Sequence, residues 1–240
     1  MATIMRPILF NTDMVTALLR RQKTVTRRAI NPQPPMDFPY CHLGGDDLFY
    51  WTTRDGDDDM MGWWPSYEQG IKPPCQPGDI LYVRETWRVQ SAHRFEADAR
   101  IEFKSGGPMS VIQFPGGMSQ SHSRESYDEF ISKWGVSGGW HPSIHMPRDA
   151  ARIFLRVTGV WVEQLHEITE HGAKQEGVSL PLESINDPEY ADYIGGHYGV
   201  FRNLWDRTIK PAYRAVYGWD ANPWVWVIEF DLISRKDAQI

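Results

Sequence analysis

Lys23-Thr24-Val25-Thr26-Arg27-Arg28 stands directly after a short amphipathic segment and places an amine, hydroxyls and two guanidinium groups within six residues. A lysine beside a threonine can form a base-and-nucleophile pair if burial and nearby cations keep the amine neutral. Basic residues that follow a helix also have a structural use, because they interact favourably with the helix dipole. Taken alone, the stretch favours that structural interpretation.

Composition and charge narrow the class of protein. The chain has 240 residues, enough for one elaborated domain or two small ones. Its net charge of −6 argues against tight binding of duplex DNA, which needs many phosphate contacts, but allows a local pocket for a nucleoside or a single exposed base. Eleven Trp and ten Tyr residues can stack on bases, although filling a core is their commoner use.

The sequence carries no sign of secretion or of a membrane. Two cysteines, Cys41 and Cys75, do not make a disulfide framework. Arg6 and Pro7 interrupt the first residues, so no signal-peptide core forms, and no apolar run is long enough for a membrane span. We therefore expect a cytoplasmic protein with no membrane partner.

Periodicity and capping signals predict short strands with few helices. Strands are predicted over residues 7–10, 24–30, 80–87, 152–157 with 160–165, and 224–232, and helices over 12–21, 125–134, 169–177 and 198–209. Asn11 or Thr12 is expected to cap the first helix, and Thr169 and Gly177 to bound the third. Residues 181–196 are interpreted as irregular.

This pattern predicts an α+β fold, a small and mostly antiparallel barrel with peripheral helices. We expect one domain over residues 1–234 with insertions at about 36–74 and 91–141, followed by a frayed polar tail, 235–240. The first insertion is expected to hold a small hairpin. Its Asp57-Asp58-Asp59 run is interpreted as a solvated loop near Trp63-Trp64-Pro65.

Four segments, in this order, resemble the ASCH domain of the PUA-like superfamily: the first helix with residues 23–26, then 77–83, then 152–165 leading into 168–177, and last 226–230. The longer layout, including residues 142–148, is similar to ASCH proteins carried by bacteriophages and prophages. The resemblance covers less than half of the chain and implies a PUA-like barrel. In this family, a small bacterial amidohydrolase removes acetyl from N4-acetylcytidine, whereas other PUA-like domains only bind RNA or modified bases.

The resemblance also implies site residues. The small amidohydrolase uses a Lys-x-x-Thr pair and a glutamate on the helix after Ile-Thr-Glu, which correspond here to Lys23, Thr26 and Glu176. The two insertions depart from the family pattern and leave the size and identity of the substrate open.

The chemistry of such a site sets conditions on the lysine. To take the proton of Thr26, Lys23 must lower its pKa by about three units from about 10.4, on the order of 4 kcal/mol. Arg27 and Arg28 would help, whereas Glu176 opposes and is therefore assigned a later proton transfer or an orienting role.

Strand geometry adds a second condition. Residues three apart on a strand point to opposite faces, so Lys23 must lie in the preceding turn or next to a bulge to meet Thr26. Thr24 would share a face with Thr26 and is a rival nucleophile.

Further candidates for substrate binding have weaker support in the sequence. They are Thr24, Arg27, Arg84, Glu85, Trp87, Ser143, His145 and Arg148. Glu85 and Trp87 have structural alternatives as a solvated carboxylate and a core indole, and the loop at 143–148 as a site of surface hydrogen bonding. The spacing of His141 and His145 would suit a metal on a helix, but Pro142 and Pro147 argue against a helix, so we expect no metal and no cofactor.

Two hypotheses follow. The first is an amidohydrolase acting on an N-acylated nucleoside or base through a lysine-activated threonine. The alternative is a non-catalytic module that binds RNA or a modified base, with Arg27, Arg28, Arg84 and aromatic rings as contacts. A ribonuclease is a weaker third interpretation. The expected partner is a nucleoside or a single-stranded base.

Overall fold

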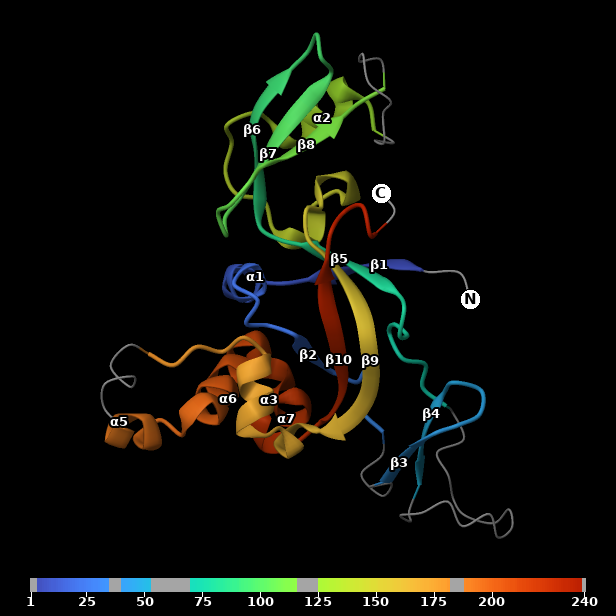
Figure 1. Cartoon of the computed structure of the whole chain (residues 1–240), viewed down its shortest axis with the longest axis vertical. Coiled ribbons are helices and arrows are strands. Elements are labelled where there is room, and N and C mark those ends of the chain that lie inside the picture. Colours follow the sequence, from blue (N-terminus) through green and yellow to red (C-terminus); the bar gives the residue numbers. More distant parts are fainter. Residues whose placement is uncertain (1–3, 35–39, 53–69, 116–124, 182–187, 239–240) are drawn as a thin grey trace. The chain divides into compact units, whose positions relative to one another are not determined.

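The computed structural model describes residues 4–34, 40–52, 70–115, 125–181 and 188–238 (Figure 1). The chain divides into two compact units. Unit 1 comprises Met1–Gln22, Gly78–Arg156 and Asp231–Ile240, and unit 2 comprises Lys23–Pro77 and Val157–Phe230. The single domain expected over residues 1–234 stays a prediction. β9 (Phe154–Gln164) and β10 (Trp224–Ile233) each contribute residues to both units.

Unit 1 begins with a strand and a capped helix. β1 (Met5–Leu9) pairs in parallel with β5 (Ile80–Arg84), and β5 pairs antiparallel with the first residues of β9. α1 (Thr12–Leu19) starts at Asn11, whose side chain accepts a hydrogen bond from Met14 N. The predicted cap is confirmed, and the helix ends two residues before the predicted Arg21.

The second insertion is a small sheet covered by a helix. β6 (Trp87–His93), β7 (Asp98–Phe103) and β8 (Ser110–Gln113) form an antiparallel sheet in that order. α2 (Tyr127–Trp134) begins with a capping box between Ser126 and Glu129 and contributes Phe130 to the core of this sheet. Two 3₁₀ turns, η1 (Ser143–His145) and η2 (Arg148–Ala150), follow. The sequence analysis predicted the helix and missed all three strands.

The predicted strand over residues 80–87 is wrong as a single element, because β5 and β6 belong to different sheets. The ladder breaks at Glu85. Its backbone N–H contacts Sδ of Met146, and its carboxylate turns to Arg152, so this residue cannot continue the pairing of β5.

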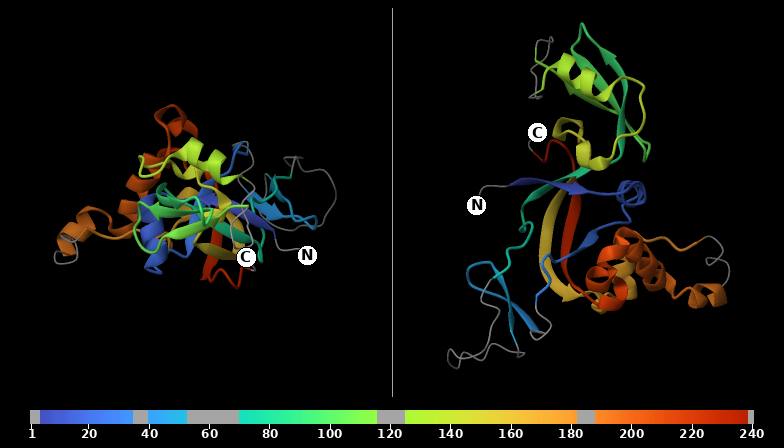
Figure 2. Two further views of the ribbon diagram at one scale, coloured as in Figure 1. Left: turned by 90° about the horizontal axis from the view of Figure 1, so that it is seen from above. Right: turned by 180° about the vertical axis from the view of Figure 1, so that it is seen from behind.

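Unit 2 is organised around β10. β2 (Val25–Ala29) pairs antiparallel with β10, with Thr26 opposite Ile228 and Arg27 opposite Val227. The hydrogen-bonded order of the larger sheet is β1-β5-β9-β10-β2, and β9 and β10 lie side by side in Figures 1 and 2. Among the described residues this order does not close into a barrel, so the structure confirms an α+β chain with mainly antiparallel sheets and no more of the predicted barrel.

The two faces of this sheet in unit 2 meet different partners. α3 (Glu170–Gln175) and α6 (Gly196–Thr208) pack with Val25, Val225 and Val227 in one buried cluster. On the other face, the hairpin of β3 (Tyr40–Leu43) and β4 (Phe49–Thr52) sets Phe49 against Trp226, with ring centroids 5.0 Å apart. The hairpin confirms the expectation for the first insertion, whereas Asp57–Asp59 and Trp63–Pro65 lie outside the described residues.

η3 (Leu165–Glu167) precedes α3. Besides α6, the described helices that follow α3 are α5 (Pro188–Tyr193), η4 (Pro211–Tyr213), α7 (Arg214–Tyr217) and η5 (Trp219–Ala221). α5 falls in the segment that was predicted to be irregular. The predicted frayed tail is also wrong at Ala238, which is only 4% exposed and packs in the core of unit 1. No helix in the described ranges is both long and apolar enough to cross a bilayer.

The contact between α3 and α6 depends on a glycine. Glu170 accepts hydrogen bonds from the backbone N–H groups of His197 and Tyr198, at the start of α6. Gly196 has φ of +59°, and a Cβ added there would lie 2.9 Å from a Glu170 oxygen. Only glycine therefore fits without strain.

We expect Gly196→Ala to lower the free energy of unfolding by about 1–3 kcal/mol, because the change adds backbone strain and a steric clash. Chemical denaturation of purified protein measures the effect. Gly139→Ala is the matched control, since a Cβ there has nothing within 4 Å; its effect should stay within about 0.5 kcal/mol. Equal stability of the two variants would contradict this account of α6.

Candidate active site

Lys23 lies in the turn that precedes β2. Its backbone forms an isolated antiparallel bridge with Glu176, the residue that ends α3. The next residue is fixed on both sides, because Thr24 N donates to Gln175 O and Thr24 O accepts from Phe230 N. The lysine is therefore outside the regular strand, and the geometric condition for meeting Thr26 is satisfied.

The Lys23 ammonium has three oxygen acceptors. Nζ lies 2.6 Å from Oε2 of Glu176, 2.9 Å from the Glu176 carbonyl oxygen and 2.8 Å from the Val25 carbonyl oxygen. The exposed fractions of the two side chains are 0% and 4%. Three acceptors match the three N–H donors of an ammonium, so the geometry describes a charged, buried ion pair in its resting form.

Thr26, which follows Val25 on β2, is only 1% exposed. Because Thr24 O points to β10, alternation turns the Val25 carbonyl to the outer edge of β2, where Nζ binds it. Thr26 and Arg28 point to the face that meets the hairpin, and Arg27 points to the face that meets α3. The lysine thus lies at the strand edge between the two faces, and one of its acceptors must be released before its lone pair can turn to Thr26. Thr24, the rival nucleophile, is exposed.

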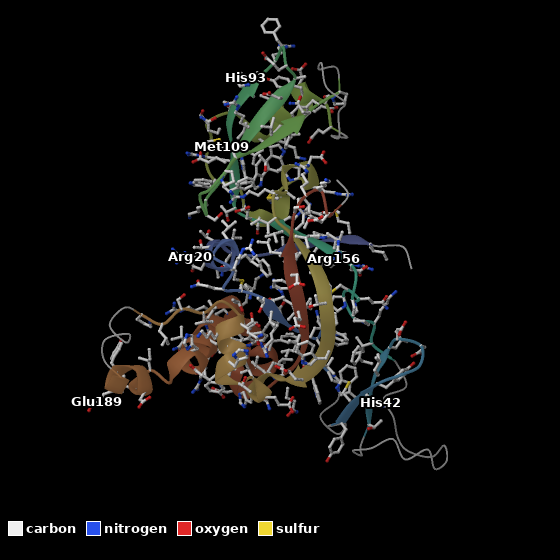
Figure 3. The ribbon with its side chains drawn as sticks, viewed as in Figure 1. Arg20, His42, His93, Met109, Arg156 and Glu189 are labelled. Atoms are coloured by element: carbon white, nitrogen blue, oxygen red, sulfur yellow. The ribbon has the colours of Figure 1, made fainter. Side chains whose placement is uncertain are left out.

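Arg27 divides its guanidinium between two carboxylates. Nε donates to Oε1 of Glu163 at 2.6 Å, and Nη1 donates to Oε1 of Glu176 at 3.3 Å. Glu176 therefore gives one oxygen to Lys23 and the other to Arg27. Gly172 on α3 permits this close approach, because a Cβ there would lie 3.1 Å from Nη2 of Arg27. Side chains fill the space between α3, α6 and β10 (Figure 3).

Burial lowers the pKa of Lys23 below its ordinary value, and the charges of Arg28 and Arg27 act in the same direction. The charge and the hydrogen bond of Glu176 oppose this shift. These directions agree with the expectation from the sequence that Arg27 and Arg28 favour the neutral amine of Lys23 and that Glu176 opposes it. Burial also lowers the pKa of Arg28, again against the pull of Glu176.

Glu85 is fully engaged in unit 1. Its oxygens accept from Nε and Nη2 of Arg152 at 2.8 and 2.9 Å, and from the hydroxyl of Ser105. The same guanidinium donates to Pro108 O and lies 4.1 Å over the Phe103 ring. Glu85 is 1% exposed, so its contacts are those of a structural ion pair that ties the β7–β8 loop to the end of β5.

Of the other predicted binding residues, Thr24 and Arg27 belong to unit 2, and Arg84, Trp87, Ser143, His145 and Arg148 belong to unit 1. Trp87 is fully buried in its core, in agreement with the structural alternative. Arg84 donates to the carbonyl of Ile144, and the exposed residues His145 and Arg148 lie in the two 3₁₀ turns, with half-buried Ser143 starting the first. The three residues implied to be catalytic are all in unit 2.

His141 does not present a metal-binding pair with His145. Its Nε2 is hydrogen-bonded to the Trp134 carbonyl at 3.1 Å, and its ring packs on Trp87. In the part of the chain that the structure describes, no group of three or more His, Cys, Asp or Glu side chains could hold a metal ion.

Comparison with known proteins gives no significant match to a protein-family model, a curated protein or a solved structure.

Sequence reasoning missed Glu163, Trp161, Gly172, Arg152 and Ser105. Glu163 gave a weak signal, as a carboxylate inside a segment predicted to be a strand. Its partner Arg27 is 136 residues away, and nothing local indicates that pairing. Gly172 carried a better signal, because glycine is unfavourable inside a helix unless something approaches it closely.

Gly172→Ala tests the contact between α3 and Arg27. Alanine would favour the helix by about 1 kcal/mol, but its Cβ would displace a guanidinium held on two sides by carboxylates. We expect a net loss of about 1 kcal/mol in unfolding free energy. Lys174→Ala, an exposed change on the same helix, is the control and should raise stability slightly or leave it unchanged. A stabilised Gly172→Ala variant would show that Arg27 is loosely held.

Glu85→Ala tests the structural assignment of the second ion pair. Removing the carboxylate leaves the Arg152 charge buried and uncompensated, which costs about 3–5 kcal/mol. Joint replacement of Glu85 and Arg152 by methionine should cost less than the single change. Thermal unfolding measures both. An unchanged melting temperature for Glu85→Ala would show that the ion pair adds little stability. The Glu85 carboxylate of the wild-type protein would then remain a candidate for ligand binding.

Proposed function

We propose that this protein is an amidohydrolase that acts on an N-acylated nucleoside or base, such as N4-acetylcytidine. The observation that carries the proposal is the buried Lys23 amine, which is held by Glu176 at 2.6 Å and by the carbonyl of Val25, the residue before Thr26. Its lowered pKa and the two neighbouring guanidiniums support a lysine that can lose its charge. The resemblance of the four segments to ASCH domains supports the same assignment and a PUA-like fold.

In the proposed reaction, Lys23 first passes one proton to Glu176, which leaves a neutral amine and a carboxylic acid. Thr26 then attacks the amide carbonyl carbon and gives its proton to Lys23. Arg28, on the same strand face as Thr26, stabilises the oxyanion. The C–N bond breaks as Glu176 protonates the leaving amine. The Glu176 carboxylate then deprotonates a water, which attacks the carbonyl carbon of the threonine ester. The ester C–O bond breaks as the Lys23 ammonium returns its proton to Thr26 Oγ, and the acid is released.

A second candidate is a non-catalytic module that binds RNA or a modified base. One observation favours it: the three acceptors around Nζ suit a permanently charged, structural lysine. A titration with single-stranded RNA at several salt concentrations separates the two. A steep salt dependence without turnover would favour the module.

The hydrolytic proposal is tested by acetate release from N4-acetylcytidine. We expect Lys23→Met and Thr26→Val each to lower kcat/KM by about a thousand-fold or more, because each removes a reacting group. Thr24→Val distinguishes the two threonines and should lose far less activity than Thr26→Val. Inactivation by Thr24→Val with an active Thr26→Val would move the nucleophile to Thr24. Full activity of both Lys23→Met and Thr26→Val would reject the mechanism.

A further inference from the structure

We propose that Arg27 and Glu163 form a positioning pair that sets the protonation state of Lys23. Arg27 competes with Lys23 for Glu176, and Glu163 competes with Glu176 for Arg27. The functional consequence rests on the proposed amidohydrolase activity, whereas the effect on the lysine can be measured without any substrate. Neither residue has a place in the three catalytic roles assigned above.

The pair is part of one continuous chain of hydrogen bonds. Trp161 Nε1 donates to Oε2 of Glu163 at 3.2 Å, and Arg27 Nε donates to Oε1 of the same carboxylate at 2.6 Å. Arg27 Nη1 then reaches Oε1 of Glu176 at 3.3 Å, and Oε2 of Glu176 holds Lys23 at 2.6 Å. In each carboxylate the two oxygens bind different partners.

This arrangement makes the hold on Lys23 adjustable. An arginine stays charged, so its pull on Glu176 depends on how far Glu163 neutralises it. The shorter of its two ion pairs is the one with Glu163, and the contact with Glu176 is long. Weakening Glu163 should turn Arg27 toward Glu176 and loosen the lysine. Removing Arg27 should give Glu176 wholly to Lys23.

The charged groups around the lysine are few in the described part of unit 2. α3 contributes Glu176 at its C-cap, together with Glu170, His171 and Lys174, which are exposed. β2 contributes Arg27 and Arg28, and β9 contributes Glu163. β10 contributes Glu229, which stands opposite Val25 and accepts a hydrogen bond from Thr158 at 3.2 Å. Glu229 therefore offers a control carboxylate on a neighbouring strand, because it is hydrogen-bonded to Thr158 and not to Arg27.

The inference predicts shifts of opposite sign. Glu163→Gln should lower the pKa of Lys23, because an uncompensated Arg27 repels the ammonium and draws away its counter-ion. Arg27→Gln should raise it, for the reverse reasons. Each shift should be about one pH unit. Because a lysine base must be neutral, the acid limb of the pH profile of kcat/KM should move down in Glu163→Gln and up in Arg27→Gln.

The experiment is a pH titration of the full-length protein with isotope-labelled lysine, followed by NMR. The Lys23 signal is assigned by its loss in Lys23→Met. The variants are Glu163→Gln, Arg27→Gln, their combination, and Glu229→Gln as control. The combined variant should match Arg27→Gln alone, since Glu163 acts only through Arg27. If Arg27→Gln does not fold, Arg27→Lys serves, because it keeps the charge and should stay close to wild type while Glu163→Gln shifts.

The outcomes separate this inference from the proposed function. Opposite shifts of the lysine without release of acetate would support the positioning pair and reject the amidohydrolase. Hydrolysis with a lysine pKa that moves in neither variant, or that moves equally in Glu229→Gln, would overturn the positioning pair alone. Additive shifts in the combined variant would also overturn it, because Glu163 would then act on Lys23 directly.

Discussion

The ion pair between Lys23 and Glu176 joins two segments that lie 153 residues apart in the chain. It does so with the side chains and also with the backbone bridge between the same two residues. Moving both charges out of water is costly, and the attraction between them repays the cost only when the remaining protons find acceptors. The carbonyl groups of Val25 and Glu176 supply those acceptors, so the start of β2 and the end of α3 are fixed together.

The protein contains a second buried ion pair, in which both carboxylate oxygens are hydrogen-bonded to a single arginine. Glu85 and Arg152 meet with two parallel hydrogen bonds, and Ser105 adds a third contact to the carboxylate. Such a pair has no spare partner and suits a structural role. Glu176, in contrast, is divided between two cations, one close and one distant. That asymmetry distinguishes an adjustable pair from a fixed one.

Local signals in the sequence predicted local structure well. Asn11, Thr169 and Gly177 bound their helices as expected, because a cap depends on residues within one turn. The break after β5 could not be foreseen, since the alternation of residues 80–87 is that of one strand and the break depends on Arg152. At the site, the lowering effect of Arg27 and Arg28 on the pKa of Lys23 was predictable from neighbours in sequence, and the opposing effect of Glu176 was implied by the family resemblance. The role of Glu163 was not, because it is reached only through tertiary contact.

The position of Lys23 at a helix end also opposes the loss of charge that the proposed reaction requires of this residue. One of its acceptors is the carbonyl of the residue that ends α3, where the helix dipole favours a cation. Burial and the two arginines act against that preference and lower the pKa of Lys23, whereas Glu176 raises it. In the proposed reaction, a substrate carbonyl would add no positive charge near an amine that is already fully buried. Release of one of its three oxygen acceptors is therefore the step that would free its lone pair.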